Sequence, residues 1–233
     1  MEFYSRPDLY ASDTLSTMDV DHLLAQLRGN GWASTTGSPD ELETQIRRHG
    51  MKAAPTQRGR SRQILRPRAV PEAPRNTMSA RVGLGQQWLH TDGAHLLRPP
   101  EVILLATRTV STTATRIWSG VVRGTAVGSI IQIPPEDARL GVFTVHDGRD
   151  SFLASAWDGF LRVDPGCMTP ADGYARSAES YFQQLPTFDF EWDEPDKLLL
   201  IDNHNCLHGR ATVTEGDQGR VLERRTYEYG GVA

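Results

Sequence analysis

The spacing of hydrophobic residues in the first third of the chain is helical. Apolar residues recur every three or four positions across residues 18–28, and Gly29 follows as a helix stop. A second helix is expected from Ser38 to Gly50, because Ser-Pro-Asp-Glu at its start offers an N-cap, a first-turn proline and acids at the positive end of the helix dipole. The amino-terminal part is therefore predicted to be largely helical.

From about residue 78 onward the pattern changes to short segments rich in β-branched, aromatic or aliphatic residues, separated by Gly, Pro and Asp. The expected strands lie at residues 87–92, 102–109, 115–122, 129–133, 152–163, 188–192, 198–201 and 221–229. One helix is expected among them, at residues 170–184. Many short strands favour a mainly β sandwich or jelly roll with flanking helices. We expect one domain, in which a helical and arginine-rich segment (1–77) packs on a β core (78–233).

Length and composition are those of a single globular domain. The chain has 233 residues, of which 38% are hydrophobic and 23% charged, so its core needs no disulfide or metal staple. Its two cysteines, Cys167 and Cys206, form neither a disulfide framework nor a thiolate zinc site, which favours the cytoplasm. The start of the sequence, MEFYSRPDLYASDT, lacks the pattern of a secretory signal. No apolar run approaches the length of a membrane span.

Charge is distributed unevenly along the chain. Residues 47–75 carry nine cations and one acid, a net charge of +8 in a chain whose formal net charge is -4. Four prolines indicate that this arginine-rich stretch is a loop. A solvated loop is the favoured interpretation, and an acidic carrier protein that presents a tethered substrate is the second. Nucleic acid ranks last, because no aromatic residues interleave with the arginines to stack on bases.

Two separated motifs carry groups that can bind a metal. In an extended segment successive side chains alternate, so His90 and Asp92 project from one face and Thr91 from the other. His-x-Asp is common by chance, but here a late apolar strand runs toward His208, and Arg220 follows twelve residues later. This order of motifs is a far more specific indication of a metal site than any one of the motifs alone.

The chemistry of these groups explains why they occur together. Two histidines and one carboxylate form the facial triad of non-heme Fe(II) oxygenases, which leaves coordination positions open. A 2-oxo acid can take two of these positions and O2 the third. The far carboxylate of 2-oxoglutarate then requires a cation, and an arginine fork such as that of Arg220 matches it with two charge-assisted bonds. Zinc is the alternative metal for the same ligands.

At this point the sequence resembles a known family. His90-Thr91-Asp92, His208-Gly209-Arg210 and the pair Arg220 and Arg224 are similar to motifs of the Fe(II)/2-oxoglutarate-dependent dioxygenases, in the branch of taurine dioxygenase and clavaminate synthase. The resemblance extends over residues 78–229. It implies a double-stranded β-helix, a cupin-like jelly roll, with Fe(II) held by His90, Asp92 and His208.

The resemblance also assigns the remaining site residues. Residues 111–115 are similar to the family's small-residue turn that ends in a threonine, so Thr115 would hydrogen-bond the 2-oxoglutarate carboxylate that Arg220 binds, with Thr112 or Thr113 as alternatives. Arg224 would face an anionic group of the substrate. A covering lid would come from residues 141–150 or from the amino-terminal segment.

The implied activity is hydroxylation of an unactivated C–H bond in a small metabolite, an amino acid or a carrier-bound intermediate, with 2-oxoglutarate and O2 consumed and succinate and CO2 released. Asp92 stands where the related halogenases have Gly or Ala, which argues against chlorination. The alternatives are a non-catalytic, cupin-like metal- and ligand-binding protein and a nucleic-acid demethylating dioxygenase. His95 and His204 are expected in loops or in contact with a ligand residue, and Cys206 as a small buried hydrophobe.

Overall fold

The computed structural model describes residues 19–55, 60–74, 77–123, 129–132 and 134–230. Its helices are α1 (Val20–Asn30), α2 (Pro39–Arg48), α3 (Met78–Val82), α4 (Glu136–Leu140) and α5 (Gly173–Gln183), with a 3-10 turn, η2 (Val70–Glu72). Its strands are β1 (Trp32–Thr36), β2 (Met51–Ala53), β3 (Arg62–Leu65), β4 (Val102–Ala106), β5 (Ser111–Ser119), β6 (Val121–Arg123), β7 (Ser129–Ile131), β8 (Phe143–His146), β9 (Ser151–Ala154), β10 (Met168–Pro170), β11 (Phe188–Trp192), β12 (Lys197–Asp202), β13 (Cys206–Arg210) and β14 (Leu222–Tyr229).

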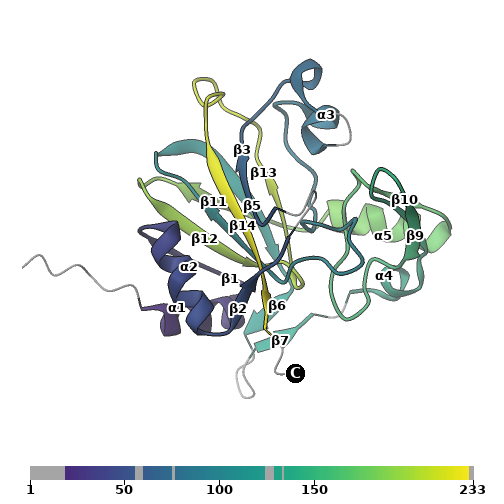
Figure 1. Cartoon of the computed structure of the whole chain (residues 1–233). Helices are drawn as coiled ribbons and strands as arrows, with labels where there is room; N and C mark the ends of the chain where they lie inside the picture. The colour runs from purple at the N-terminus through teal and green to yellow at the C-terminus, as the bar shows by residue number, and fades with distance from the viewer. Residues whose placement is uncertain (1–18, 56–59, 75–76, 124–128, 133, 231–233) are drawn as a thin grey trace, which may run out of the picture.

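Two antiparallel sheets enclose the central core (Figure 1). The larger has the order β1-β12-β4-β14-β2, with β3 also paired to β14, and the smaller has the order β11-β5-β13. Side chains alternate along each strand, so Leu105 and Leu199 of the larger sheet meet Ile117 and Trp192 of the smaller one. The mainly β, jelly-roll fold predicted from the sequence is confirmed.

The outer face of the larger sheet is covered by α1 and α2. The alternate residues Leu104, Leu198 and Leu200 point to this side and pack against the apolar faces of both helices. The two predicted helices are confirmed in type, with Gly31 in the left-handed conformation after α1 and Ser38 as the N-cap of α2. Met18, where the first helix was expected to begin, lies outside the described residues.

The amino-terminal segment contributes strands as well as helices. β1 pairs with β12, and β2 and β3 pair with β14. The prediction of a loop throughout residues 47–75 is therefore wrong at β2, β3 and η2, because the edge of β14 supplies backbone hydrogen-bond partners that outweigh local composition. Arg58 and Arg75 of this stretch lie outside the described residues. The division of the chain at residue 77 stays a prediction.

Two predicted strands and one predicted turn are corrected. Residues 87–92 form a single bridge, His90 to His208, and no strand. Only the first residues of 152–163 are strand, as part of β9, because the chain turns at Gly159 with a φ of 75°. Residues 111–115, expected as a turn, begin β5, since they pair with β11 and β13. The last residue of the expected strand 129–133 lies outside the described residues.

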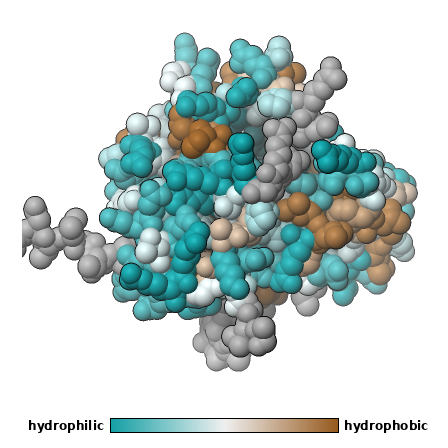
Figure 2. Space-filling model, viewed as in Figure 1, coloured by the Kyte–Doolittle hydropathy of each residue, from teal (hydrophilic) through white to brown (hydrophobic). Residues whose placement is uncertain are grey.

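A second hydrophobic cluster lies beside the jelly roll. It joins α4, α5 and the small sheet β10-β8-β9 around Phe143, Val145 and Phe182, and it reaches the jelly roll through Trp118 and Leu207. β8 and β10 escaped sequence prediction because they are only four and three residues long. Residues 141–150, considered as a lid, contain β8 and the turn to β9. Figure 2 shows hydrophobic residues gathered on the side of α5 and β10, while the surface elsewhere in this view is mostly hydrophilic.

Among the described residues, no helix combines the length and apolar character needed to cross a membrane.

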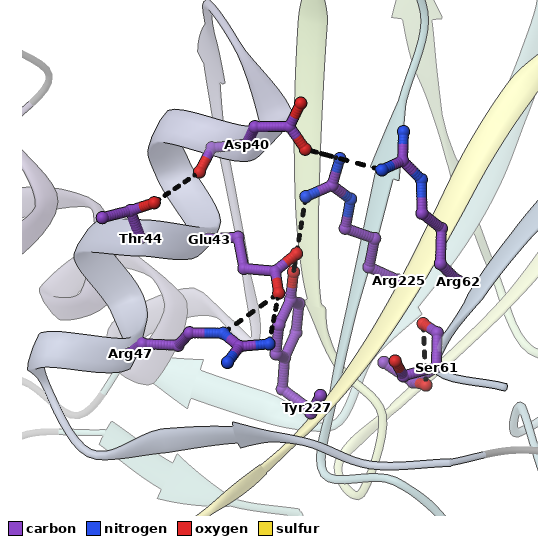
Figure 3. Close-up of a pocket in the computed structure, with 10 residues that line it drawn as sticks. Asp40, Glu43, Thr44, Arg47, Ser61, Arg62, Arg225 and Tyr227 are labelled. Atoms are coloured by element: carbon purple, nitrogen blue, oxygen red, sulfur yellow. Dashed lines mark hydrogen bonds and ion pairs between the residues drawn. The ribbon is translucent and has the colours of Figure 1, made fainter. Parts of the chain in front are cut away.

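Charged side chains join α2 to the outer face of β14 (Figure 3). Arg225 is only 3% exposed, and its guanidinium contacts Asp40 and Glu43 of α2 and Glu223 of its own strand. A cavity of about 470 Å³ lies between these elements, but the described charged groups that line it are paired with one another. This cavity therefore belongs to the docking of α2, on the side of β14 opposite to Arg224.

Replacing Arg225 by Ala is expected to lower the free energy of unfolding in urea by about 3 kcal/mol, because the partly buried carboxylates of Glu43 and Glu223 lose their cation. The matched control is Arg47→Ala, which removes a half-exposed partner of Glu43 and should cost less than about 1 kcal/mol.

The Arg225 guanidinium holds the pKa of Asp40 below its usual range and, although burial opposes this, does the same for Glu43. The stabilisation is complete above the unfolded-state pKa values and is lost as the pH falls through the lower folded-state values, so wild-type stability should fall more steeply than that of the variant below about pH 4. Equal losses of unfolding free energy in Arg225→Ala and Arg47→Ala would contradict the role of Arg225.

Candidate active site

The side chains of His90, Asp92 and His208 come together between the two sheets. Asp92 Oδ1 lies 3.7 Å from His90 Nε2, and Asp92 Oδ2 lies 3.6 Å from His208 Nε2. Asp92 and His208 are buried and His90 is partly buried. One potential ligand atom from each residue lies within 4.8 Å of the other two, which makes this a candidate metal centre within the described part of the chain.

A close approach of two chain segments produces this cluster. His90 and His208 exchange backbone hydrogen bonds, with distances of 3.0 and 3.1 Å between the nitrogen and oxygen atoms. The next residue of β13 is Gly209, where a Cβ atom would lie 2.8 Å from the carbonyl oxygen of Trp88. Glycine is required at this position because any side chain would push the segment that carries His90 away from β13.

Hydrogen bonding indicates which imidazole nitrogens face the centre. His90 Nδ1 lies 3.0 Å from the carbonyl oxygen of Trp88, so this nitrogen donates a hydrogen bond and Nε2 faces Asp92. Burial opposes the charged form of His90, but the Asp92 carboxylate raises its pKa, so a metal ion at this centre would displace the Nε2 proton. Burial lowers the pKa of His208 and favours its neutral form. Burial opposes ionisation of Asp92, yet Arg224 and both imidazoles hold its pKa well below the usual range. Neutral imidazole and ionised carboxylate are the states that bind metals.

The residues fit a divalent cation. Asp92 Oδ2 is buried and has no hydrogen-bond partner among the described residues, an arrangement that is costly for an anion unless a cation binds it. Two nitrogen donors and one oxygen donor, without a nearby thiolate, match the donor set of non-heme iron. Cys206 is fully buried in the central core and its Sγ contacts the carbonyl of Gly31, as expected for a small hydrophobe.

Arg224 lies directly beside the triad. It projects from the inner face of β14, contacts Asp92 Oδ1, and donates from Nη2 to Gln63 Oε1 of β3. Its Nε is buried without a partner among the described residues. Its predicted contact with a substrate anion stays a prediction. Gln63 was missed by sequence reasoning because only the pairing of β3 with β14 brings it here.

Arg220 lies on a different side of the site, close to β5. It is 7% exposed, its guanidinium donates to the carbonyl of Thr113, and it lies 5.9 Å from the ring of Trp192. Burial lowers the pKa of Arg220 to about 10, which still leaves it charged at neutral pH. The last strand was expected from residue 221, and β14 begins at Leu222, so Arg220 lies just before the strand. A buried guanidinium on an aromatic face is suited to binding a carboxylate.

Thr115 belongs to the same cluster. Its Oγ1 accepts a hydrogen bond of 3.1 Å from Trp192 Nε1, so its hydroxyl hydrogen can point to another acceptor. The side-chain oxygens of Thr112 and Thr113 instead lie 2.5 and 3.5 Å from Thr214 Oγ1. Thr115 therefore differs from the other two threonines in its contact with Trp192, which sequence reasoning missed and which also lies against Arg220; the cofactor role of Thr115 stays a prediction.

The loop after Asp92 is held in a defined shape. Arg162 is 5% exposed and donates to the carbonyls of Ala94, Leu96 and Leu97. His95 of this loop has a buried Nε2 without a partner among the described residues. Burial lowers its pKa and favours the neutral imidazole.

His204, the other histidine near the motifs, lies in the turn before β13. Its Nε2 is 2.9 Å from the carbonyl oxygen of Pro99, and its ring stacks on Phe160 with centroids 4.8 Å apart. These contacts place it away from the triad, in the loop position that the sequence predicts.

Comparison with known proteins gives the fold. No model of a protein family matches the chain, and a search of curated proteins finds no match. Among solved structures, an asparagine oxygenase in complex with Fe(II), 3-hydroxyasparagine and succinate aligns with a TM-score of 0.67 at 15% identity, covering 91% of this chain and 79% of that one. The non-heme iron oxygenase OrfP with Fe, succinate and (3S)-hydroxy-L-Arg aligns with a TM-score of 0.61 at 17% identity, covering 91% and 80%. The chain therefore shares its fold with non-heme iron oxygenases.

Replacing Gly209 by Ala is expected to displace the segment that carries His90 and to weaken Co(II) binding at least about tenfold, because the new Cβ collides with backbone atoms. The measurement is the visible spectrum of the protein titrated with Co(II). Gly173→Ala at the start of α5 is the control, since its Cβ would have no neighbour closer than 3.9 Å. An unchanged Co(II) affinity in Gly209→Ala would refute the proposed tight fit.

Proposed function

We propose that the protein is an Fe(II)- and 2-oxoglutarate-dependent oxygenase that hydroxylates an unactivated C–H bond of a small metabolite and releases succinate and CO2. The observation that carries this proposal is the buried triad of His90, Asp92 and His208, together with the buried Arg220 just before β14, the strand whose Arg224 contacts Asp92. The fold that the chain shares with non-heme iron oxygenases supports it.

Each group of residues has a distinct task. His90, Asp92 and His208 would hold the iron, which when bound supplies the oxidative chemistry. Arg220 would bind the distal carboxylate of 2-oxoglutarate, and Thr115 would donate a hydrogen bond to the same carboxylate. Burial of Arg220 makes both interactions stronger than they would be in water. The OrfP complex with Fe and alpha-ketoglutaric acid, which aligns with a TM-score of 0.60 at 16% identity, supports this choice of cosubstrate.

The alternatives explain fewer of the observations. A non-catalytic cupin-like protein could bind a metal through the same triad, and zinc could occupy it, but neither needs a carboxylate-binding arginine next to Thr115 and Trp192. A nucleic-acid demethylase would need aromatic side chains to stack on bases, and residues 47–75 contain none. The carboxylate of Asp92 occupies the position that a chlorinating enzyme would leave to a halide.

Two unpartnered atoms favour a small polar substrate. Arg224 Nε and His95 Nε2 are both buried and lack partners among the described residues; Arg224 contacts Asp92, and His95 follows Asp92 by three residues. Arg224 suits a carboxylate and His95 a second polar group, as in an amino acid. The hydroxyasparagine and hydroxyarginine named for the similar structures support this class. We place the reaction in the cytoplasm, which the two free cysteines support.

Anaerobic addition of Fe(II) and 2-oxoglutarate is expected to produce a weak visible charge-transfer band that His208→Ala abolishes.

Arg220→Leu should raise the 2-oxoglutarate concentration for half-saturation about 10- to 100-fold, because a charge-assisted pair is lost. Arg62→Leu is the control, since that arginine pairs with Asp40 and Glu223 on the outer side of β14.

The same preparation, screened with amino acids, carrier-bound acyl groups and pathway intermediates, should release succinate faster in the presence of the true substrate. Absence of the band, together with no 2-oxoglutarate-dependent succinate with any compound, would refute the enzymatic function.

An acidic carrier protein is a further proposed partner. Arg66 and Arg68 are exposed just beyond β3, whose Gln63 contacts Arg224, so positive charge borders the site. Arg66→Glu combined with Arg68→Glu should raise KM for a carrier-bound amino acid about tenfold and leave KM for the free amino acid unchanged. Arg176→Glu on the distant helix α5 is the control. If neither added salt nor the double variant changes the turnover of the carrier-bound amino acid, the free metabolite is the substrate.

A further inference from the structure

The segment that carries His90 and Asp92 lacks a strand neighbour on the side away from β13. Buried backbone groups of Leu89, Thr91 and Asp92 in this segment need hydrogen-bond partners that no strand supplies. Thr91 N donates to the carbonyl of Val163 at 2.6 Å. The other two residues are bound by side-chain amides from elsewhere in the fold, in place of a strand.

Asn203 binds both backbone groups of Asp92. Its Oδ1 accepts from Asp92 N at 2.9 Å, and its Nδ2 donates to the carbonyl of Asp92 at 2.9 Å and to that of Pro100 at 2.8 Å. The Asn203 side chain is fully buried, and its residue lies in the turn between β12 and β13, 111 positions from Asp92 in the sequence. One amide thus fixes the peptide groups on both sides of the Asp92 Cα atom.

Gln183 at the end of α5 makes a similar contact with Leu89. Its Oε1 accepts from Leu89 N and its Nε2 donates to the carbonyl of Leu89, both at 3.1 Å. Gln183 thereby supports the neighbour of His90, whereas Asn203 supports Asp92 itself. Fixing both peptide planes of a residue fixes the direction of its Cα–Cβ bond and leaves only side-chain rotation.

We propose that Asn203 is a positioning residue of the metal centre, which holds the Asp92 carboxylate in the direction needed to share a cation with His90 and His208. The inference rests on the proposed function to the extent that this centre binds Fe(II). Asp92 is followed by Gly93 with a φ of 73°, so the chain turns away at once and no regular structure holds Asp92 from that side. Without the amide, the backbone of Asp92 would be restrained only by its neighbours along the chain.

The same turn offers a matched control. Asn205 Nδ2 donates to Asp202 Oδ2 at 2.8 Å, and Asn205 makes no contact with Asp92. Asn205→Ala therefore tests the contribution of the turn to stability alone. Asn203→Asp has nearly the volume of the native side chain, but it loses both N–H donors and places a carboxylate oxygen against the carbonyls of Asp92 and Pro100.

The test is a Co(II) titration of the full, metal-free chain at pH 7.5, followed by the visible absorption of the bound ion, with near-UV circular dichroism to measure the folded fraction. Asn203→Ala and Asn203→Asp are both expected to weaken Co(II) binding about 10- to 100-fold, as removal of an orienting partner usually does. Asn205→Ala should lower the unfolding temperature with no change in Co(II) affinity. Gln183→Ala should weaken Co(II) binding, but by less than the Asn203 variants do. If Asn203→Ala is unfolded, the comparison is made at 10 °C with Asn203→Ser.

The outcomes separate the two proposals. Wild-type affinity in folded Asn203 variants would overturn the positioning role alone. A wild-type chain that binds Co(II) but never forms succinate would overturn the oxygenase function and leave the positioning role standing. A wild-type chain that binds neither Co(II) nor Fe(II) would overturn both.

Discussion

The site depends on how closely one irregular segment approaches β13. His90 and His208 can share a centre only because their backbones are hydrogen-bonded to each other, and this distance is possible because Gly209 has no side chain. The rest of the fold brings these segments together. Two sheets bury an apolar core between them, and the triad lies on their inner side, where burial makes an unpaired carboxylate oxygen a strong attraction for a cation.

β14 separates two electrostatic environments. Its inner face presents Arg224 to Asp92, and its outer face presents Arg225 to the acids of α2. Because side chains alternate along a strand, Arg224 borders the candidate active site, while its neighbour Arg225 holds α2 on the sheet. β3 pairs with the same strand and adds Gln63 beside Arg224. The amino-terminal segment therefore contributes directly to the site.

The residues that support the site come from many parts of the chain. Trp192 of β11 connects Thr115 to Arg220, Arg162 shapes the loop of His95, and Asn203 binds the backbone of Asp92. None of these three is marked by a local motif, since the groups to which their side chains hydrogen-bond lie between 65 and 111 positions away. A buried tryptophan or asparagine must satisfy its polar atoms, but the sequence does not say which distant backbone or hydroxyl group will do so.

Residue type and order along the chain were enough to predict a mainly β jelly roll, two capped helices at its start, and the candidate groups His90, Asp92, His208 and Arg220. These features follow from local periodicity and from the chemistry of the side chains themselves. The tertiary structure decided that the arginine-rich stretch adds strands to β14, that residues 87–92 form no strand, and that Thr115 contacts Trp192 whereas Thr112 and Thr113 contact Thr214. Those outcomes depend on which free strand edge, aromatic face or buried amide lies opposite in space, and only the folded chain specifies that.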